Sequence, residues 1–123
     1  MATFLAGHDK VESVCYPWLS DSHDKALAEK YLPKGCSGVI SFSLKGGRDA
    51  GARFIDSLKM VSLQVHVADI RTCVLHPASS THRQLSDEQL TEAGITPGMV
   101  RLSVGLENID DLLEDLSQAL AQA

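Results

Sequence analysis

The sequence has 123 residues, 44% of them hydrophobic and 22% charged, with a formal net charge of −5, which is the composition of one globular domain. Its positive charge is too sparse and scattered for a protein that binds nucleic acid, where lysine and arginine are concentrated. No apolar run approaches the ~20 residues of a membrane-spanning helix, which argues against an integral membrane protein.

The cysteines give a further indication of class. Cys15, Cys36 and Cys73 are odd in number and widely spaced, which is typical of reduced thiols and not of a disulfide framework. The N-terminus lacks the basic start and apolar core of a secretory signal. We therefore expect a cytoplasmic protein.

Predicted strands and helices alternate along the first half of the chain. In chain order, the pattern indicates the end of a helix over 2–9, a strand over 11–17, a one-faced helix over 20–32, a strand over 36–44 and a helix over 50–58. Pro17 stops the first strand because proline cannot donate to a ladder. In the second strand, apolar residues alternate with Val39, Ser41 and Ser43, which is the pattern of a half-buried strand.

The second half has clearer boundaries. Residues 62–69 are ambiguous between strand and loop, 72–76 and 99–104 are predicted strands, and 86–94 and 108–120 are predicted helices. Ser86 and Gln89 have the spacing of a capping box at the start of a helix. Gly94 is placed to close that helix, and Asn108 to cap the last one.

This order of elements indicates an α+β fold, a two-layer sandwich in which a mostly antiparallel sheet carries helices on one face. Residues 1–123 are expected to form a single domain. The second face of the sheet would carry Val39, Ser41, Ser43, Arg101 and Ser103. Because this face is neither apolar nor fully polar, it suits docking against another domain or enclosing a polar ligand.

Arg101 lies inside an alternating strand, between the apolar residues Val100 and Leu102. Rigid backbone would hold its guanidinium in one place, which suits a two-point grip on a carboxylate. The pattern alone leaves two interpretations equally open: a ligand's carboxylate, or a salt bridge to a carboxylate such as Glu107 or one on a partner domain.

Other candidate sites have weaker patterns. The possible zinc ligands of one short span are His66, Cys73, His76 and His82. They lack the close spacing of zinc motifs, so we expect structural histidines and no metal. Residues 45–48, Lys-Gly-Gly-Arg, precede a helix that could attract phosphate, but without a Walker or dinucleotide pattern a plain turn with solvated side chains is expected. The hydroxyl cluster at 79–81 lacks a GxSxG elbow and indicates turns.

Several separated motifs resemble one enzyme family in order and spacing. They are HPASSTH (76–82), LSDEQLTEAGI (85–95) and GMVRLSVGLENIDDLLEDL (98–116), supported by VESVCYP (11–17) and GVISFSL (38–44). The family is the Cys/Met-metabolism enzymes, which depend on pyridoxal phosphate, and the resemblance is to their C-terminal domain, the small domain of fold-type I transferases. Within the family, residues 66–90 are most similar to O-acetylhomoserine sulfhydrylases.

The resemblance implies a reaction and three substrate-binding residues. Such enzymes use the cofactor as an electron sink, expel acetate from O-acetyl-L-homoserine and add sulfide to give homocysteine. The arginine that grips the substrate's α-carboxylate in the family falls on Arg101, and a threonine near the same site falls on Thr81. Relatives carry Ser or Asn before a Gly-Asp pair where this chain has 66–69, so the residue that helps contact the carboxylate end is His66 here.

The resemblance also implies partners. In the family, the Schiff-base lysine, the aromatic that stacks on the cofactor and most phosphate ligands belong to a larger N-terminal domain. None of Lys10, Lys25, Lys30, Lys34, Lys45 and Lys59 reproduces the lysine motif. We therefore expect this chain to supply no catalytic and no cofactor-binding residue, to be inactive alone, and to belong to a full-length homo-oligomer, a tetramer.

The sequence is also compatible with other reactions and other roles for this chain. The chain could belong to a cystathionine γ-synthase or a γ-lyase, since the groups that select the nucleophile lie largely in the other domain. It could also be a stand-alone amino-acid-binding module, or it could serve oligomer assembly.

Overall fold

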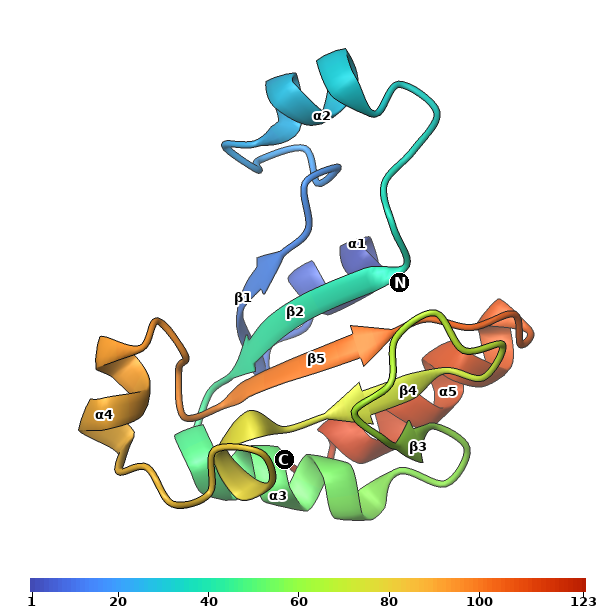
Figure 1. The fold of residues 1–123 in the computed structure, drawn as a ribbon. Coiled ribbons are helices and arrows are strands. Elements are labelled where there is room, and N and C mark those ends of the chain that lie inside the picture. Colours follow the sequence, from blue (N-terminus) through green and yellow to red (C-terminus); the bar gives the residue numbers. More distant parts are fainter.

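The computed structural model describes residues 1–123 as a five-stranded sheet with helices packed mainly on one side (Figure 1). In spatial order, the strands are β1 (Val11–Cys15), β2 (Val39–Leu44), β5 (Met99–Ser103), β4 (Cys73–Leu75) and β3 (Ser62–Leu63). The first three neighbouring pairs are antiparallel, and only β3 and β4 are parallel. The predicted, mostly antiparallel sheet is therefore confirmed.

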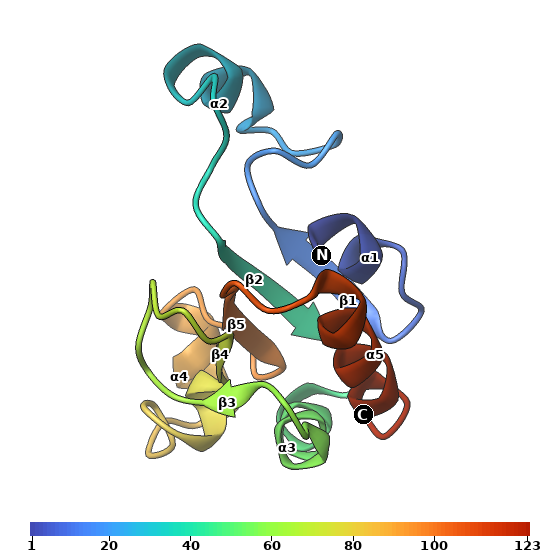
Figure 2. The same cartoon turned by 90° about the vertical axis from the view of Figure 1, so that its right-hand side faces the viewer.

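Three helices cover one face of the sheet. They are α1 (Ala2–Ala6), α3 (Gly47–Ser57) and α5 (Ile109–Leu120). Figure 2, which views the sheet nearly along its edge, shows α1 and α5 on one side of it and α4 (Asp87–Glu92) on the other. The predicted two-layer α+β sandwich is confirmed, and the opposite face of the sheet carries only loops and short helical turns.

The core lies between the sheet and these helices. Phe42 of β2 and Phe54 of α3 pack edge to face, with ring centroids 5.8 Å apart, and Val100, Leu102 and Leu116 are fully buried around them. Each such side chain contributes about 1.5–3 kcal/mol by leaving water. This core fixes the backbone of β2 and β5, and therefore the positions from which their other side chains point to the open face.

Local sequence signals correctly placed the start of α4 and the start of α5, while the helix predicted over 50–58 begins earlier, at Gly47. The Ser86 side chain accepts from the Gln89 backbone N–H while the Gln89 side chain accepts from that of Ser86, so the capping box is confirmed. Asn108 accepts from the Asp110 backbone N–H and caps α5. Gly94 follows α4 with a φ of 76°, a left-handed conformation that glycine adopts without strain.

The predicted helix at 20–32 is shorter than expected, and it does not lie on the face of the sheet with α1, α3 and α5. Only Lys25–Tyr31 are helical, as α2, and residues 16–38 project from the sheet as an arm with α2 at its tip (Figure 1). The apolar side of α2 does not pack on the core, since Leu27, Tyr31 and the following Leu32 are exposed.

The ambiguous segment 62–69 is mostly loop. Its first two residues form β3, and residues 64–70 then cross over the open face of the sheet before β4. None of the helices has the length and apolar character needed to cross a membrane.

Candidate functional site

The open face of the sheet is built by alternate residues of neighbouring strands. In the register of β2 and β5, Val39 faces Ser103, Ser41 faces Arg101, and Ser43 faces Met99. Directly opposed residues share a face, so the predicted grouping of Val39, Ser41, Ser43, Arg101 and Ser103 is confirmed. Leu75 of β4 faces Arg101 from the other side.

Loops cover this face at two ends and leave its middle open. At one end, the hydroxyls of Ser43 and Thr96 are 2.7 Å apart. At the other end, the Ser103 hydroxyl accepts from the Ala68 backbone N–H at 2.9 Å. Ser43 and Ser103 are consequently buried, while Ser41 and Arg101 between them are only half-buried.

Arg101 makes one hydrogen bond within the chain, from Nη2 to the Val65 carbonyl at 2.7 Å. Its Nε is buried without a hydrogen-bond partner, which costs about 1–3 kcal/mol. The guanidinium forms no ion pair. A cation held at such a cost on an open face is arranged for something other than the stability of this chain.

The alternative of a salt bridge between Arg101 and Glu107 is not formed. The Glu107 carboxylate instead accepts from the Thr72 backbone N–H at 2.6 Å and from the Thr72 hydroxyl at 2.8 Å. Partial burial acts to raise the pKa of Glu107, but the hydrogen bonds from Thr72 outweigh it and the pKa lies below its ordinary value. Glu107 therefore stabilises the start of β4 and leaves Arg101 uncompensated.

The free side of the guanidinium suits an anion. Guanidinium carries five N–H donors, and Val65 occupies one of those on Nη2 of Arg101. Nη1 makes no hydrogen bond within the chain, so it can combine with the second Nη2 proton in the two parallel hydrogen bonds that a carboxylate accepts.

The structure places His66 and Thr81 differently with respect to Arg101. His66 is exposed and directly follows Val65, the residue whose carbonyl Arg101 binds. The Thr81 hydroxyl, in contrast, lies 2.9 Å from Nδ1 of its neighbour His82 and is not hydrogen-bonded to Arg101. The backbone of His66 thus adjoins the residue that Arg101 binds, whereas Thr81 makes no hydrogen bond with Arg101.

The loop that carries His66 has features that the sequence did not indicate. Ala68 has a φ of 61°, the only left-handed residue other than glycine. Two hydrogen bonds join this loop to β5, one from Arg101 to the Val65 carbonyl and one from the Ala68 N–H to Ser103. The one available signal was the spacing of Arg101 and Ser103, two residues apart on a strand and therefore on one face.

Of residues 45–48, Lys45 and Gly46 form the predicted turn, while Gly47 and Arg48 already belong to α3, and the arginine is not solvated as expected. Arg48 Nη2 donates to the Leu85 carbonyl at 2.9 Å and pairs with Asp87 at 2.8 Å, and Nη1 donates to the Ala78 carbonyl. These contacts fasten the segment 77–87 to α3. The cation is thus occupied in holding the fold, which argues against a phosphate site there.

The histidines expected to be structural do not gather around a metal, since no group of three or more His, Cys, Asp or Glu lies close enough to hold one. His76 is fully buried, with Nε2 2.9 Å from the Pro97 carbonyl and Nδ1 2.8 Å from the Ser79 hydroxyl. Because a carbonyl only accepts, Nε2 carries the proton. Burial lowers the pKa of His76, so the ring is neutral.

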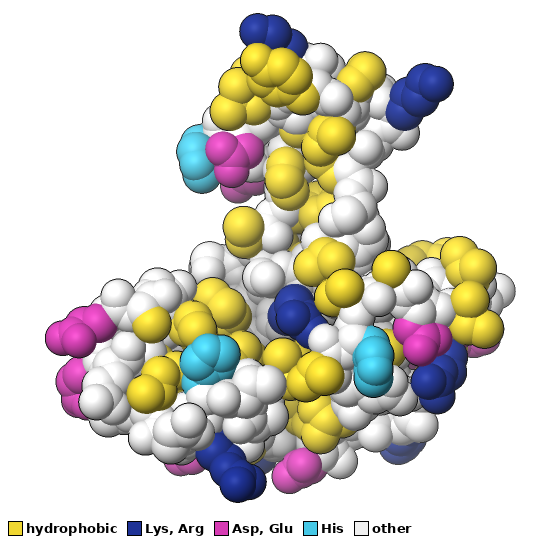
Figure 3. Space-filling model, viewed as in Figure 1, with side chains coloured by type: hydrophobic (Ala, Val, Ile, Leu, Met, Phe, Trp, Pro, Cys, Tyr) yellow, Lys and Arg dark blue, Asp and Glu magenta, His cyan; other side chains and the backbone are white.

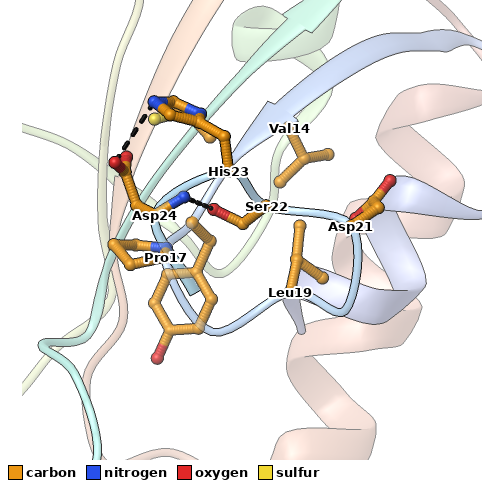
Figure 4. Close-up of a pocket in the computed structure, with 9 residues that line it drawn as sticks. Val14, Pro17, Leu19, Asp21, Ser22, His23 and Asp24 are labelled. Atoms are coloured by element: carbon orange, nitrogen blue, oxygen red, sulfur yellow. Dashed lines mark hydrogen bonds and ion pairs between the residues drawn. The ribbon is translucent and has the colours of Figure 1, made fainter. Parts of the chain in front are cut away.

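Two hollows flank the open face. One, of about 140 Å³, lies beside Ser41, the β2 residue that faces Arg101. It is lined mainly by Ser13, Cys15, Ser41, Ser43, Thr96 and Met99. The other, of about 290 Å³, lies at the base of the arm (Figure 4). Its polar contacts are local, between His23 and Asp24 at 3.1 Å and from the Asp24 N–H to Ser22 at 3.3 Å. These contacts explain the shape of the turn at residues 22–24 and indicate no ligand.

Hydrophobic side chains border the middle of the open face. Figure 3 shows basic atoms there, with hydrophobic side chains around them and on the arm above. The exposed apolar residues of β3 and the following 64–70 loop are Leu63, Val65, Val67 and Ile70, and those of the arm are Leu27, Tyr31 and Leu32. Exposed apolar surface on both sides of a cation is typical of a surface that meets another protein part.

Comparison with known proteins identifies relatives over nearly the whole chain. The family model described as Cys/Met metabolism PLP-dependent enzyme matches residues 1–121, which confirms the resemblance seen in the motifs. An O-acetyl-L-homoserine sulfhydrylase from Leptospira meyeri is 48% identical over 98% of this chain and 27% of its own length. An L-methionine gamma-lyase from Fusobacterium nucleatum subsp. polymorphum is 46% identical over 95% of this chain and 29% of its own length.

A solved structure shares the fold. It is a Campylobacter jejuni protein assigned as an O-acetylhomoserine (thiol)-lyase and carries a pyridoxyl-lysine phosphate group. It superposes with a TM-score of 0.87 at 41% identity, over 98% of this chain and 28% of its own. The chain thus spans less than a third of the length of these relatives.

Proposed function

Because the chain belongs to the Cys/Met metabolism PLP-dependent enzyme family, we propose that it is the C-terminal, substrate-capping domain of a larger enzyme of this family. The enzyme would convert O-acetyl-L-homoserine and sulfide to homocysteine and acetate. The observation that carries the proposal is Arg101, an unpaired guanidinium on the open face with donors free for a carboxylate.

The domain's task is to bind and orient the substrate. Arg101 grips the α-carboxylate through two charge-assisted hydrogen bonds. The Val65 carbonyl holds the guanidinium in place at 2.7 Å, and the exposed His66 follows Val65 in the same loop. Thr81, on the segment fastened by Arg48, is included in the site on the family resemblance alone.

The residues of this chain do not fit a complete cofactor site. Lys10 and Lys45 donate to the carbonyls of Ala123 and Asp9, Lys25 lies near Glu29, and Lys30 lies over the Tyr31 ring. Pyridoxal phosphate, when bound by the rest of the enzyme, supplies the electron sink. The chain alone should therefore show no turnover.

The partner that completes the site is the cofactor domain of the same protein. The exposed apolar residues of the arm and of the 64–70 loop lie on either side of the open face, where that domain would cover them. A homotetramer of the full-length protein, as expected from the family resemblance, is part of this proposal.

A γ-lyase is the second candidate, because a relative of that name is about as similar as the sulfhydrylases. The two are distinguished by assaying the full-length protein. A sulfhydrylase forms homocysteine from O-acetylhomoserine and sulfide, whereas a γ-lyase releases 2-oxobutanoate from methionine. Dominant 2-oxobutanoate formation would overturn the sulfhydrylase assignment.

A stand-alone amino-acid-binding module, by contrast, would need no other domain. Calorimetry on the isolated chain tests it, since half a site should bind O-acetylhomoserine or methionine weakly. Tight binding of either amino acid by the chain alone would favour the module over the enzyme domain.

A further inference from the structure

Two residues of β5 hold the middle of the loop that borders the site. Arg101 Nη2 donates to the Val65 carbonyl at 2.7 Å, and the Ser103 hydroxyl accepts from the Ala68 N–H at 2.9 Å. The two side chains leave the strand on the same face, and Ser103 is 97% buried, with a relative exposure of 3%. No other hydrogen bond holds residues 65–68.

The ends of the loop are anchored separately. The Gln64 N–H donates to the Val74 carbonyl at 3.0 Å, and the Ile70 carbonyl accepts from Leu106 at 2.9 Å. Gly105 packs so closely on this end that a β-carbon there would overlap the Ile70 carbonyl. The conformation between these anchors therefore depends on the two contacts with β5.

The point at which Ser103 holds the loop is also its strained point. Ala68 has a φ of 61°, a left-handed conformation that residues with a β-carbon rarely adopt. Such a conformation persists where the surroundings impose it, and strained residues gather at functional sites. The hydrogen bond from Ala68 to the buried Ser103 is the contact that imposes it here.

We infer that Ser103 is a positioning residue for substrate binding, an inference that rests on the proposed function. By fixing Ala68, Ser103 keeps the preceding residues in the conformation in which the Val65 carbonyl orients the Arg101 guanidinium. Ser103 itself does not touch the substrate. It acts on the affinity for the α-carboxylate, through the loop and Arg101.

The test is carried out on the full-length holoenzyme with three variants. Ser103→Ala removes the acceptor, and Ser103→Thr retains it. Ser43→Ala is the matched control, because Ser43 is equally buried on the same face and bonds to Thr96, in a loop that does not contact Arg101. Each variant is compared for KM and kcat with O-acetylhomoserine, and for inhibition by the substrate's decarboxylated amine analogue.

The expected result separates carboxylate binding from general damage. Ser103→Ala should raise the KM roughly 3- to 10-fold, the range for one lost hydrogen bond, with kcat and the amine's inhibition constant within about twofold. Ser103→Thr and Ser43→Ala should leave all three within about twofold. An unchanged KM, or equal weakening of amino-acid and amine binding, would overturn the inference.

Amide exchange in the chain itself gives a second readout that requires no activity. In the wild-type chain and in Ser103→Thr, the Ala68 amide should exchange at least about tenfold more slowly than in Ser103→Ala. Equal exchange in all three overturns the inference. The proposed function has its own test, the Arg101→Ala variant of the holoenzyme. An unchanged KM in that variant would overturn the proposed function, independently of the results for the Ser103 variants.

Discussion

The imidazole of His76 lies directly over the Cα of Gly51, so that a β-carbon on Gly51 would overlap the ring. Gly51 belongs to α3, and His76 begins the segment that Arg48 also fastens to this helix. The absence of a side chain at Gly51 thus lets a buried, neutral imidazole join β4 to α3.

Gly51→Ala should therefore destabilise the fold despite the higher helix propensity of alanine. Overpacking of this kind costs about 1–3 kcal/mol, against a gain of up to about 1 kcal/mol from propensity. Urea denaturation of the isolated chain measures the difference. Ala52→Gly on the same helix is a control for propensity alone, and a Gly51→Ala variant as stable as wild type would contradict the packing argument.

Asp115 organises the turn after α3. Its carboxylate accepts from the backbone N–H groups of Lys59, Met60 and Val61 at 2.9–3.0 Å. Burial acts to raise the pKa of Asp115, but these bonds, with one from the Gln118 side chain, outweigh it, so the pKa lies below its usual value. Asp115→Ala should cost about 1–3 kcal/mol of unfolding free energy because one buried and two partly buried backbone donors lose their acceptor.

The same carboxylate predicts a pH dependence. A group whose pKa is lower in the folded state stabilises the fold above its unfolded pKa, about 3.9 for aspartate. That stabilisation is lost as the pH falls from there through the folded pKa. Comparing Asp115→Asn with wild type at pH 7 and pH 3 tests this, since the stability difference should shrink at low pH. A difference that stays constant would show that charge is not involved.

Ala68→Gly should stabilise the chain. Glycine adopts a φ of 61° freely, which removes about 1–2 kcal/mol of strain, while the greater freedom of the unfolded chain returns about 0.4–1 kcal/mol. We expect a net gain of about 0.5–1 kcal/mol in urea denaturation. A net loss would indicate that Ala68 is not held in the left-handed conformation in solution.

The backbone amides of the arm should be protected from hydrogen exchange once the rest of the enzyme is present. In the isolated chain, Tyr31 is 67% exposed and the backbone of α2 should exchange its amide protons quickly. In the full-length protein, residues 25–32 should exchange at least about tenfold more slowly. The helix α4, which is also short but buries its own apolar residue Leu90, is the control. Equal exchange of 25–32 in both proteins would remove the arm from the interface.

The sequence predicted what depends on neighbouring residues. The capping box of Ser86 and Gln89 and the Asn108 cap are complete within a few residues, so their geometry follows from spacing alone. The alternation of 39–44 and 99–103 likewise identified both faces of the sheet, because the period of a strand determines which side chains share a face.

The contacts that the sequence did not predict join distant segments. Ser103 bonds to a residue 35 positions away, and Arg101 to one 36 positions away. Asp115 reaches 54 to 56 positions back. Nothing in the local pattern of a serine or an aspartate specifies such a partner. For the same reason, the sequence did not predict that the apolar side of α2 is exposed: the pattern shows that a helix has an apolar side, not what covers it.

The most direct test of the account is the α-carboxylate affinity of an Arg101→Ala variant of the full-length holoenzyme. A charge-assisted contact is worth about 1.5–3 kcal/mol, so the KM for O-acetylhomoserine should rise roughly 10- to 150-fold. The inhibition constant of the decarboxylated amine should change little, and Arg101→Lys should recover only part of the loss because it cannot form the two-point grip. An unchanged KM in Arg101→Ala would contradict the account.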